Sequence, residues 1–268
     1  MRHQAKKRFG QNFLVDSNII QRIIHSIQPA QNDLIIEIGP GQGALTRPLL
    51  EIVSQLYVIE LDRDIIPILQ HNIGKSATQK LCVYATDVLT FDFSQFHRQL
   101  DTSDKLRIIG NLPYNISTPI LFHLLKSRPI ILDMHFMLQK EVVERIAAPA
   151  GNRCYGRLSV MLQAYFDVMP LFQVPASAFT PAPKVESAIL RLTPNYHNSK
   201  QINHFSQFET LVRTAFSQRR KTLRNTLKTL CTNQQIEAAG LQTSQRAEEL
   251  SVADFIRLNQ IIHCQKTV

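Results

Sequence analysis

Short apolar runs rich in β-branched residues recur through the first half of the chain, and the stretches between them carry apolar residues at helical spacing. Five runs are strand candidates: Leu34–Ile38, Leu56–Ile59, Leu81–Tyr84, Leu106–Ile109 and Ile130–Phe136. Intervening stretches such as Thr46–Ile52 and Thr118–Lys126 have the pattern of helices. Because strands alternate with helices, the pattern predicts an α/β fold with a parallel sheet covered on both faces.

The pattern changes after Phe136. Two helical stretches and then two extended runs follow: Gln139–Ala148, Arg157–Phe166, Val168–Val174 and Lys184–Leu192. The last run can close the sheet as an antiparallel hairpin partner. A polar, turn-rich segment, Thr193–Ser199, precedes a helical pattern that continues to the end of the chain. We therefore predict a sheet domain over residues 1–194 and a small all-helical domain over residues 195–268.

The segment Val212–Leu230 has the pattern of one amphipathic helix. At about 100° per residue, its apolar side chains fall within an arc of about 60° and most of its basic side chains within the adjoining arc of about 100°. The apolar set is Val212, Phe216, Leu223, Leu227 and Leu230, and the basic set is Arg213, Arg220, Lys221, Arg224 and Lys228. Arg219 is the exception, on the apolar side. An ordinary solvated face is the alternative, but the absence of any acidic residue from Arg213 to Lys228 favours contact with RNA phosphates.

Composition supports a globular protein with a polyanionic partner. The 268 residues are 44% hydrophobic and carry a formal net charge of +9, with further basic residues at Arg2, Lys6, Lys7 and Arg8. No apolar segment approaches the roughly 18 residues that span a membrane, and the start does not resemble a signal peptide, so we expect a cytoplasmic protein. The four cysteines lie far apart and the nine histidines fall in no motif, so we expect no metal site.

A glycine-rich turn follows the first strand candidate. Gly39, Gly41 and Gly43 allow the backbone to approach a bound nucleoside closely. The spacing is G-x-G-x-G instead of the dinucleotide pattern G-x-G-x-x-G, and the acidic Glu37 precedes the turn. The turn therefore suits a nucleoside with an amino-acid tail better than a pyrophosphate.

Polar side chains also follow the next three strand candidates. Glu60 can accept hydrogen bonds from both hydroxyls of a ribose, and Asp87 can accept one from an adenine amine. Turn capping is the alternative for Asp87, and Glu60 by itself does not distinguish a site for S-adenosylmethionine from one for NAD. Together with Gly39 and Asn111, these residues are expected to meet at the carboxyl edge of the parallel sheet, where open α/β folds bind ligands.

The run Asn111-Leu112-Pro113-Tyr114 suits an exocyclic amine of a flipped nucleobase. Such an amine is a poor nucleophile because its lone pair is delocalised into the ring. The side-chain carbonyl of Asn111 and the backbone carbonyl of Leu112 can hold both N–H bonds out of the ring plane, while Tyr114 stacks on the base. The alternative for an isolated run of this kind is a strand that ends in a proline turn.

Nearly the whole chain resembles the small-subunit (16S) ribosomal RNA adenine dimethyltransferases. The resemblance rests on six segments: Phe9–Leu14, Glu37–Gly43, Asn111–Ser117, Met137–Glu141, Phe179–Val185 and Ser217–Asn225. It implies a Rossmann-like class I methyltransferase fold, S-adenosyl-L-methionine as cofactor, and donor contacts from Asn12, Leu14, Gly39, Glu60, Asp87 and Asn111. It also implies that Phe179 is a second aromatic ring that contacts the base, for which core packing is the alternative.

The function implied by this resemblance is dimethylation of two adjacent adenines in a hairpin loop near the 3′ end of small-subunit rRNA. The expected partner is that rRNA within an assembling small subunit, and we expect a monomer. Three alternatives stay open: the related large-subunit enzyme that confers macrolide resistance, a non-catalytic assembly or transcription factor, and an NAD-dependent oxidoreductase. The segments Gln218–Lys221 and Phe9–Leu14 look more like the small-subunit branch than the macrolide-resistance enzyme.

Overall fold

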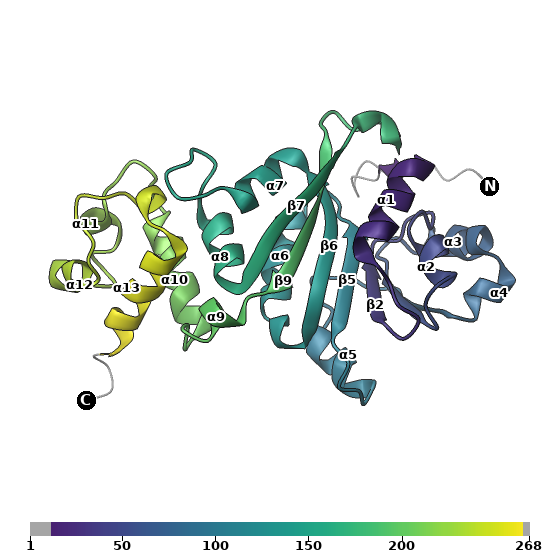
Figure 1. Cartoon of the computed structure of the whole chain (residues 1–268), viewed down its shortest axis with the longest axis horizontal. Helices are drawn as coiled ribbons and strands as arrows, with labels where there is room; N and C mark the ends of the chain where they lie inside the picture. Colours follow the sequence, from purple (N-terminus) through teal and green to yellow (C-terminus); the bar gives the residue numbers. More distant parts are fainter. Residues whose placement is uncertain (1–11, 265–268) are drawn as a thin grey trace. The chain divides into compact units, whose positions relative to one another are not determined.

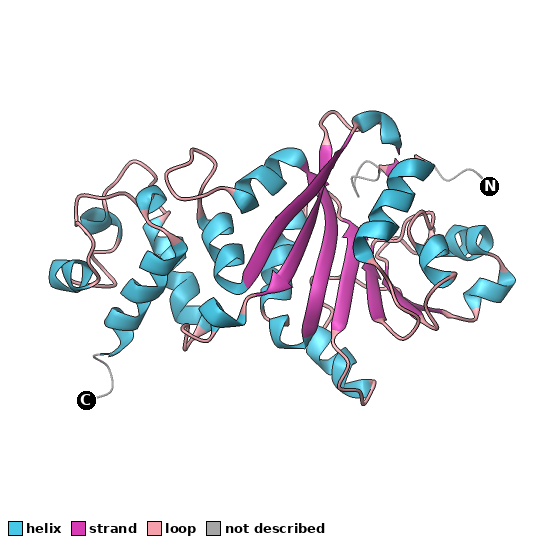
Figure 2. Ribbon diagram, in the orientation of Figure 1, coloured by secondary structure: helices cyan, strands magenta, loops and turns pink. Residues whose placement is uncertain are grey.

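A twisted seven-stranded sheet forms the core of the computed structural model, which describes residues 12–264 (Figures 1 and 2). The strand order is β4-β3-β2-β5-β6-β9-β7. The strands span Leu34–Ile38 (β2), Leu56–Ile59 (β3), Leu81–Tyr84 (β4), Leu106–Asn111 (β5), Ile131–Gln139 (β6), Phe166–Val174 (β7) and Ser187–Pro194 (β9). The first five of these strands are parallel, and β9 runs antiparallel to β6. The predicted α/β fold, its parallel strands and the antiparallel closing strand are therefore confirmed.

The strand order reverses direction next to β2. The chain moves outward from β2 to β3 and β4, then crosses back to place β5 on the other side of β2. In open α/β sheets such a switch point leaves a crevice at the carboxyl ends of the two diverging strands. Strand β5 extends two residues beyond the predicted run, so that Asn111 is itself the last residue of the strand and points to this edge.

Helices and two short strands connect the sheet strands. The helices of the first part of the chain span Ser17–Ile27 (α1), Thr46–Leu50 (α2), Ile66–Ile73 (α3), Lys75–Thr78 (α4), Phe93–Gln99 (α5), Ser117–Leu125 (α6), Lys140–Ala147 (α7) and Arg157–Tyr165 (α8). The short strands Phe13–Leu14 (β1) and Phe179–Thr180 (β8) pair antiparallel, with Leu14 opposite Phe179. None of the helices within residues 12–264 is long and apolar enough to cross a membrane.

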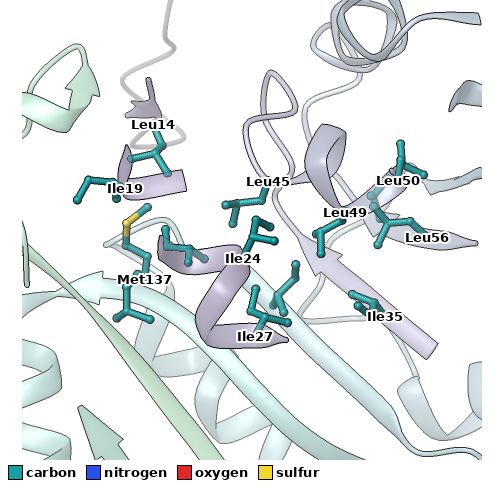
Figure 3. Close-up of a cluster of buried hydrophobic side chains, with 14 of the residues drawn as sticks. Leu14, Ile19, Ile24, Ile27, Ile35, Leu45, Leu49, Leu50, Leu56 and Met137 are labelled. Atoms are coloured by element: carbon teal, nitrogen blue, oxygen red, sulfur yellow. The ribbon is translucent and has the colours of Figure 1, made fainter. Parts of the chain in front are cut away.

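Helix α1 is the element that connects the N-terminal segment to the sheet. Its start is capped by the Asp16 carboxylate, which accepts hydrogen bonds from the backbone N–H of Asn18 (2.9 Å) and Ile19 (3.1 Å). Its apolar face joins a buried cluster that includes Ile23 and Phe179. Figure 3 draws part of this cluster and labels Ile19, Ile24, Ile27, Ile35, Leu49 and Met137 among its members. This packing fixes the short strand β1 next to the carboxyl edge of the sheet.

The other end of α1 is held by Arg107, a buried residue of β5. The Arg107 guanidinium donates to the carbonyls of Ile27 (2.6 Å) and Gln28 (3.2 Å), which end the helix. It also forms ion pairs with Asp33 (2.6 Å) and with Asp133 of β6 (2.7 Å). One side chain therefore satisfies helix carbonyls that have no partner within the helix and attaches α1 to two strands.

The chain forms two compact units. One contains the residues up to Val143 together with Met169–Thr193, and the other contains Glu144–Val168 together with the residues from Pro194 onward. The second unit holds α8 and the helices Tyr196–Ser199 (α9), Phe205–Ala215 (α10), Leu223–Thr226 (α11), Asn233–Ala238 (α12) and Val252–Cys264 (α13). The predicted division at residue 194 stays a prediction for the domains. The compact units differ from it because α8 packs against α10 and α13, with Tyr165 against Phe208.

The prediction of one helix over Val212–Leu230 was wrong. Helix α10 ends at Ala215, residues 216–222 form turns, and α11 begins at Leu223. The break has a tertiary cause, since the N–H groups of Leu223 and Arg224 donate to the carbonyls of Gln245 (2.8 Å) and Thr243 (3.1 Å) instead of to the preceding turn. The basic side chains are all exposed, but they do not lie on one helix face.

Candidate active site

A cavity of about 350 Å³ lies at the carboxyl edge of the parallel strands, where β2 and β5 diverge. Ten of the predicted site residues line it: Asn12, Leu14, Gly39, Gly41, Glu60, Asp87, Asn111, Leu112, Pro113 and Tyr114. Of the remaining predictions, Gly43 and Phe179 lie outside the lining that the described residues form. The structure therefore brings the strand-end residues together, and their individual roles stay predictions.

The glycine-rich turn has the backbone that its sequence requires. Gly39 and Gly41 have φ of 66° and 55°, in the left-handed region that side chains disfavour. A Cβ added to Gly41 would lie 3.2 Å from the ring of Phe13, so a side chain there would press on the segment that closes the cavity. Gly43 also has a positive φ, 94°, and its added Cβ would lie 2.9 Å from Leu69 of α3. It allows close packing of the turn against that helix.

Glu60 is a preformed acceptor in the cavity wall. It is only 8% exposed, and its carboxylate accepts the backbone N–H of Asp62 at 2.8 Å and those of Gly41 and Leu61. Burial raises the pKa of this carboxyl, while the backbone hydrogen bonds oppose the rise. These bonds also fix the orientation of the carboxylate, which suits recognition of a pair of hydroxyls on a ribose.

Glu37 is a second buried carboxyl in the same wall, and sequence reasoning named it only as the acidic residue before the turn. It is 2% exposed and accepts a hydrogen bond from the Thr46 hydroxyl at 2.6 Å. Burial raises its pKa to about 7, and the neighbouring charge of Glu60 adds to the rise. An acid that titrates near neutral pH next to the glycine-rich turn can pair with the ammonium group of an amino-acid tail.

Asp87 makes the turn-capping bond that was the alternative to cofactor binding, and its proposed contact with an adenine amine stays a prediction. Its carboxylate accepts the backbone N–H of Leu89 at 2.9 Å, which is the turn capping expected as the alternative. Asp87 nevertheless lines the cavity together with Thr86 and Val88, whose residue types carry no signal of a site. The capping bond holds the carboxylate at the cavity edge, where it can accept a further hydrogen bond.

The Asn111 amide has a defined orientation. Its Nδ2 donates to the backbone carbonyl of Asn12 at 3.0 Å, so Oδ1 is the atom that serves as acceptor. The backbone N–H of Leu112 donates to the carbonyl of Met137 at 3.2 Å and fixes the turn after the strand. Residue 110, immediately before Asn111, must be glycine, because an added Cβ would lie 2.5 Å from the carbonyl oxygen of Ile38 in the neighbouring strand β2.

Phe179 lies in the core beside the site. Its side chain is 4% exposed and belongs to the buried cluster that contains Leu14 and Ile19. The pairing of β8 with β1 places it opposite Leu14, which does line the cavity. The prediction that its ring contacts a base stays a prediction, and in this structure the ring packs in the core.

A parallel sheet, a glycine-rich turn after its first strand and a carboxylate after the next strand define a nucleoside-binding α/β fold. Its similarity to solved rRNA methyltransferases identifies this fold as that of a class I methyltransferase that uses S-adenosylmethionine. The model of the family described as ribosomal RNA adenine dimethylase matches residues 2–263. The chain belongs to this family, and it is an S-adenosylmethionine-dependent rRNA adenine dimethyltransferase.

Curated relatives and solved structures agree with this assignment. The chain is 55% identical to a ribosomal RNA small subunit methyltransferase A of Xylella fastidiosa, over 95% of this chain and 94% of that protein. It is 48% identical to the Haemophilus influenzae protein of the same name, over 96% and 90%. A dimethyladenosine transferase from Plasmodium falciparum superposes with a TM-score of 0.79 at 27% identity, covering 92% of this chain and 95% of that one. The 23S rRNA methyltransferase ErmE shares the fold, with a TM-score of 0.70 at 23% identity, covering 94% and 99%.

Proposed function

We propose that this enzyme transfers two methyl groups to N6 of each of two adjacent adenines in a hairpin loop near the 3′ end of small-subunit (16S) rRNA. The name and high identity of the curated relatives support the choice of the small subunit. The observation that carries the chemistry is the Asn111 amide, whose nitrogen is engaged by Asn12 so that its oxygen is the free acceptor at the cavity. An acceptor at this position suits a substrate that presents N–H bonds.

The residues at the cavity make an adenine amine nucleophilic without a general base. Asn111 Oδ1 and the Leu112 carbonyl accept hydrogen bonds from the two N–H groups and hold them out of the ring plane, which localises the lone pair on nitrogen. Pro113 fixes the turn between them, and Tyr114 stacks on the flipped base, which is worth roughly 1–3 kcal/mol. S-adenosylmethionine supplies an electrophilic methyl group when it is bound. The amine becomes acidic as it is alkylated, so water can take the proton.

The remaining cavity residues bind the cofactor in this proposal. Glu60 accepts the ribose hydroxyls and Asp87 accepts the adenine amine, while Gly39 and Gly41 bring the backbone close to the nucleoside. Asn12 and Leu14 close the cavity from the N-terminal side. Gly43 contributes through the packing of the turn against α3.

The exposed basic side chains of the helical unit bind RNA in this proposal. Arg213, Arg220, Lys221, Arg224 and Lys228 are all exposed and can contact phosphates. Arg219 differs, because it pairs with Glu248 at 2.8 Å and donates to the Arg153 carbonyl. The basic residues Arg2, Lys6, Lys7 and Arg8 lie outside the described residues. We further propose that the enzyme is a cytoplasmic monomer. We also propose that it acts on an assembling small subunit, because its target loop must be accessible.

The decisive experiment is transfer of labelled methyl groups from S-adenosylmethionine to small ribosomal subunits that lack this modification. Mass spectrometry of the product nucleosides should identify dimethyladenosine at two neighbouring positions. Protein-free large-subunit rRNA serves as the competing substrate. Methylation of that RNA alone would transfer the assignment to the macrolide-resistance branch, and binding to small subunits without transfer would favour a non-catalytic assembly factor.

A further inference from the structure

Tyr114 is attached to a strand outside its own motif. Its phenolic oxygen lies 2.6 Å from the hydroxyl oxygen of Ser187, the first residue of β9. The Ser187 side chain is fully buried, with 0% exposure, whereas Tyr114 is half-buried and lines the cavity. The hydrogen bond therefore joins a cavity residue to a fixed position in the sheet.

The start of β9 has little freedom to move. Ser187 lies opposite Gln139, the last residue of β6, in the antiparallel register. Next to this pair, the backbone N–H of Lys140 donates to the Glu186 carbonyl at 2.9 Å. The two side chains also form an ion pair, with Lys140 Nζ 3.0 Å from Glu186 Oε2. Displacing the Ser187 backbone would require β9 to separate from β6 at this end, and the burial of the residue limits where its hydroxyl can point.

A bond at the phenolic oxygen restrains the ring of Tyr114. The ring is attached to the backbone at one end, and that backbone is itself held because the Ser117 hydroxyl donates to the Tyr114 carbonyl at 3.3 Å. Fixing the phenolic oxygen at the other end restricts the rotamers of the ring. The bond involves only the oxygen, so both faces of the ring stay available for stacking. A ring that is already oriented loses less conformational freedom when a base stacks on it.

We propose that Ser187 is a positioning residue for the methyl transfer reaction. It holds the Tyr114 ring in the orientation that receives the target adenine, and it acts through this hydrogen bond without touching the RNA. The inference rests on the proposed function, since it takes Tyr114 to be the stacking residue.

A double-mutant cycle tests the proposal. Loss of one buried hydrogen bond that orients the ring should reduce kcat/KM for small-subunit rRNA about tenfold in Ser187→Ala. Tyr114→Phe keeps the ring but removes the same bond, so it should show a loss of similar size. The double variant should be no worse than either single variant, because the bond can be lost only once. The affinity for S-adenosylmethionine should not change in any of the three.

Two further variants separate orientation from general stability. Ser187→Thr retains a hydroxyl at the same position and should recover most of the activity. Ser127→Ala removes another buried serine hydroxyl at the end of α6, away from the cavity, and should leave kcat/KM unchanged. Thermal unfolding of every variant shows whether a loss of activity follows a loss of folded protein.

The outcomes distinguish this inference from the proposed function. Full activity of Tyr114→Phe, or losses that multiply in the double variant, would overturn the role of Ser187, and Tyr114→Phe gives this answer even if Ser187→Ala does not fold. If Tyr114→Ala retains full activity, the stacking role of Tyr114 fails and this inference fails with it. A severe loss in Tyr114→Ala beside full activity of Ser187→Ala would leave the proposed function intact and remove only the positioning role.

Discussion

In the proposed mechanism, single residues at the ends of parallel strands set up the chemistry of this enzyme. The sequence is enough to select Gly39, Glu60, Asp87 and Asn111 as residues of one site, because parallel strands bring their carboxyl ends to one edge of the sheet. It could not place Phe179, since the burial of that ring depends on the pairing of two short strands that are distant in sequence. It also undervalued Glu37, whose unusual pKa arises from burial and from the nearby Glu60.

At this scale, Asn111→Ala should reduce methyl transfer by at least about 10²-fold, because an oriented acceptor at the reacting group is lost. S-adenosylmethionine affinity should fall less than about tenfold, since several other residues line the cofactor cavity. Single-turnover transfer and calorimetric binding measure the two effects separately. Asn18→Ala, at an exposed position in α1, is the matched control. Loss of RNA binding in place of loss of transfer would contradict the assigned role.

Elements were predictable where local pattern and tertiary structure agree. The strands β2, β3 and β4 have the predicted bounds, because the strands of a parallel sheet covered by helices are short runs rich in apolar and β-branched residues. The segment from Val212 to Leu230 failed for the opposite reason. Its apolar spacing fits a helix, but the N–H of Leu223 pairs with a distant carbonyl, which periodicity does not reveal.

The basic residues of this segment can still be tested as a group. Replacing Arg220, Lys221 and Lys228 with Gln should weaken rRNA binding and reduce the slope of log affinity against log salt by about one unit per lost phosphate contact. Filter binding over a range of salt concentrations measures the slope. Arg98→Gln, exposed in α5, removes one positive charge outside this segment and controls for the effect per charge. An unchanged slope would mean that these side chains are merely solvated.

Helix α1 gives a second prediction at the scale of elements. Arg107→Met should lower the free energy of unfolding by about 3–5 kcal/mol, because two carboxylates and two helix carbonyls lose a buried partner. Chemical denaturation measures the change. The exposed Arg98→Met should differ from the wild type by about 0.5 kcal/mol or less. A similarly small effect of Arg107→Met would show that water replaces the hydrogen bonds of the guanidinium with no loss in the free energy of unfolding.

The pKa shifts of His135 and Glu37 give the stability of the molecule two opposing responses to pH, and the raised pKa of Glu60 acts in the same direction as that of Glu37. Burial lowers the pKa of His135 to about 4, so its contribution to stability is present above pH 6.5 and is lost as the pH falls through about 4. Burial raises the pKa of Glu37 to about 7, so its contribution is present below pH 4.5 and is lost as the pH rises through about 7. Between these limits the two effects largely cancel.

Removing either ionisable group should reveal the pH dependence of stability that the other one causes. Without cofactor, Glu37→Gln should become more stable with rising pH between about 4 and 6.5, and His135→Gln should become less stable with rising pH between about 4.5 and 7. Each slope can approach about 1.4 kcal/mol per pH unit. Urea unfolding at a series of pH values measures both. Parallel curves for the two variants would contradict the assignment of either pKa.

The second compact unit is built from two separate segments of the chain, and this has a consequence for protein synthesis. Helix α8 is made before β9, but it belongs with α10 and α13, which are made last. While the sheet forms on the growing chain, the apolar residues of α8 therefore stay exposed, because the helices that they pack against have not yet been made. A polypeptide that stops at residue 194 keeps α8 in this state permanently, so it should be prone to aggregation even though its sheet is complete.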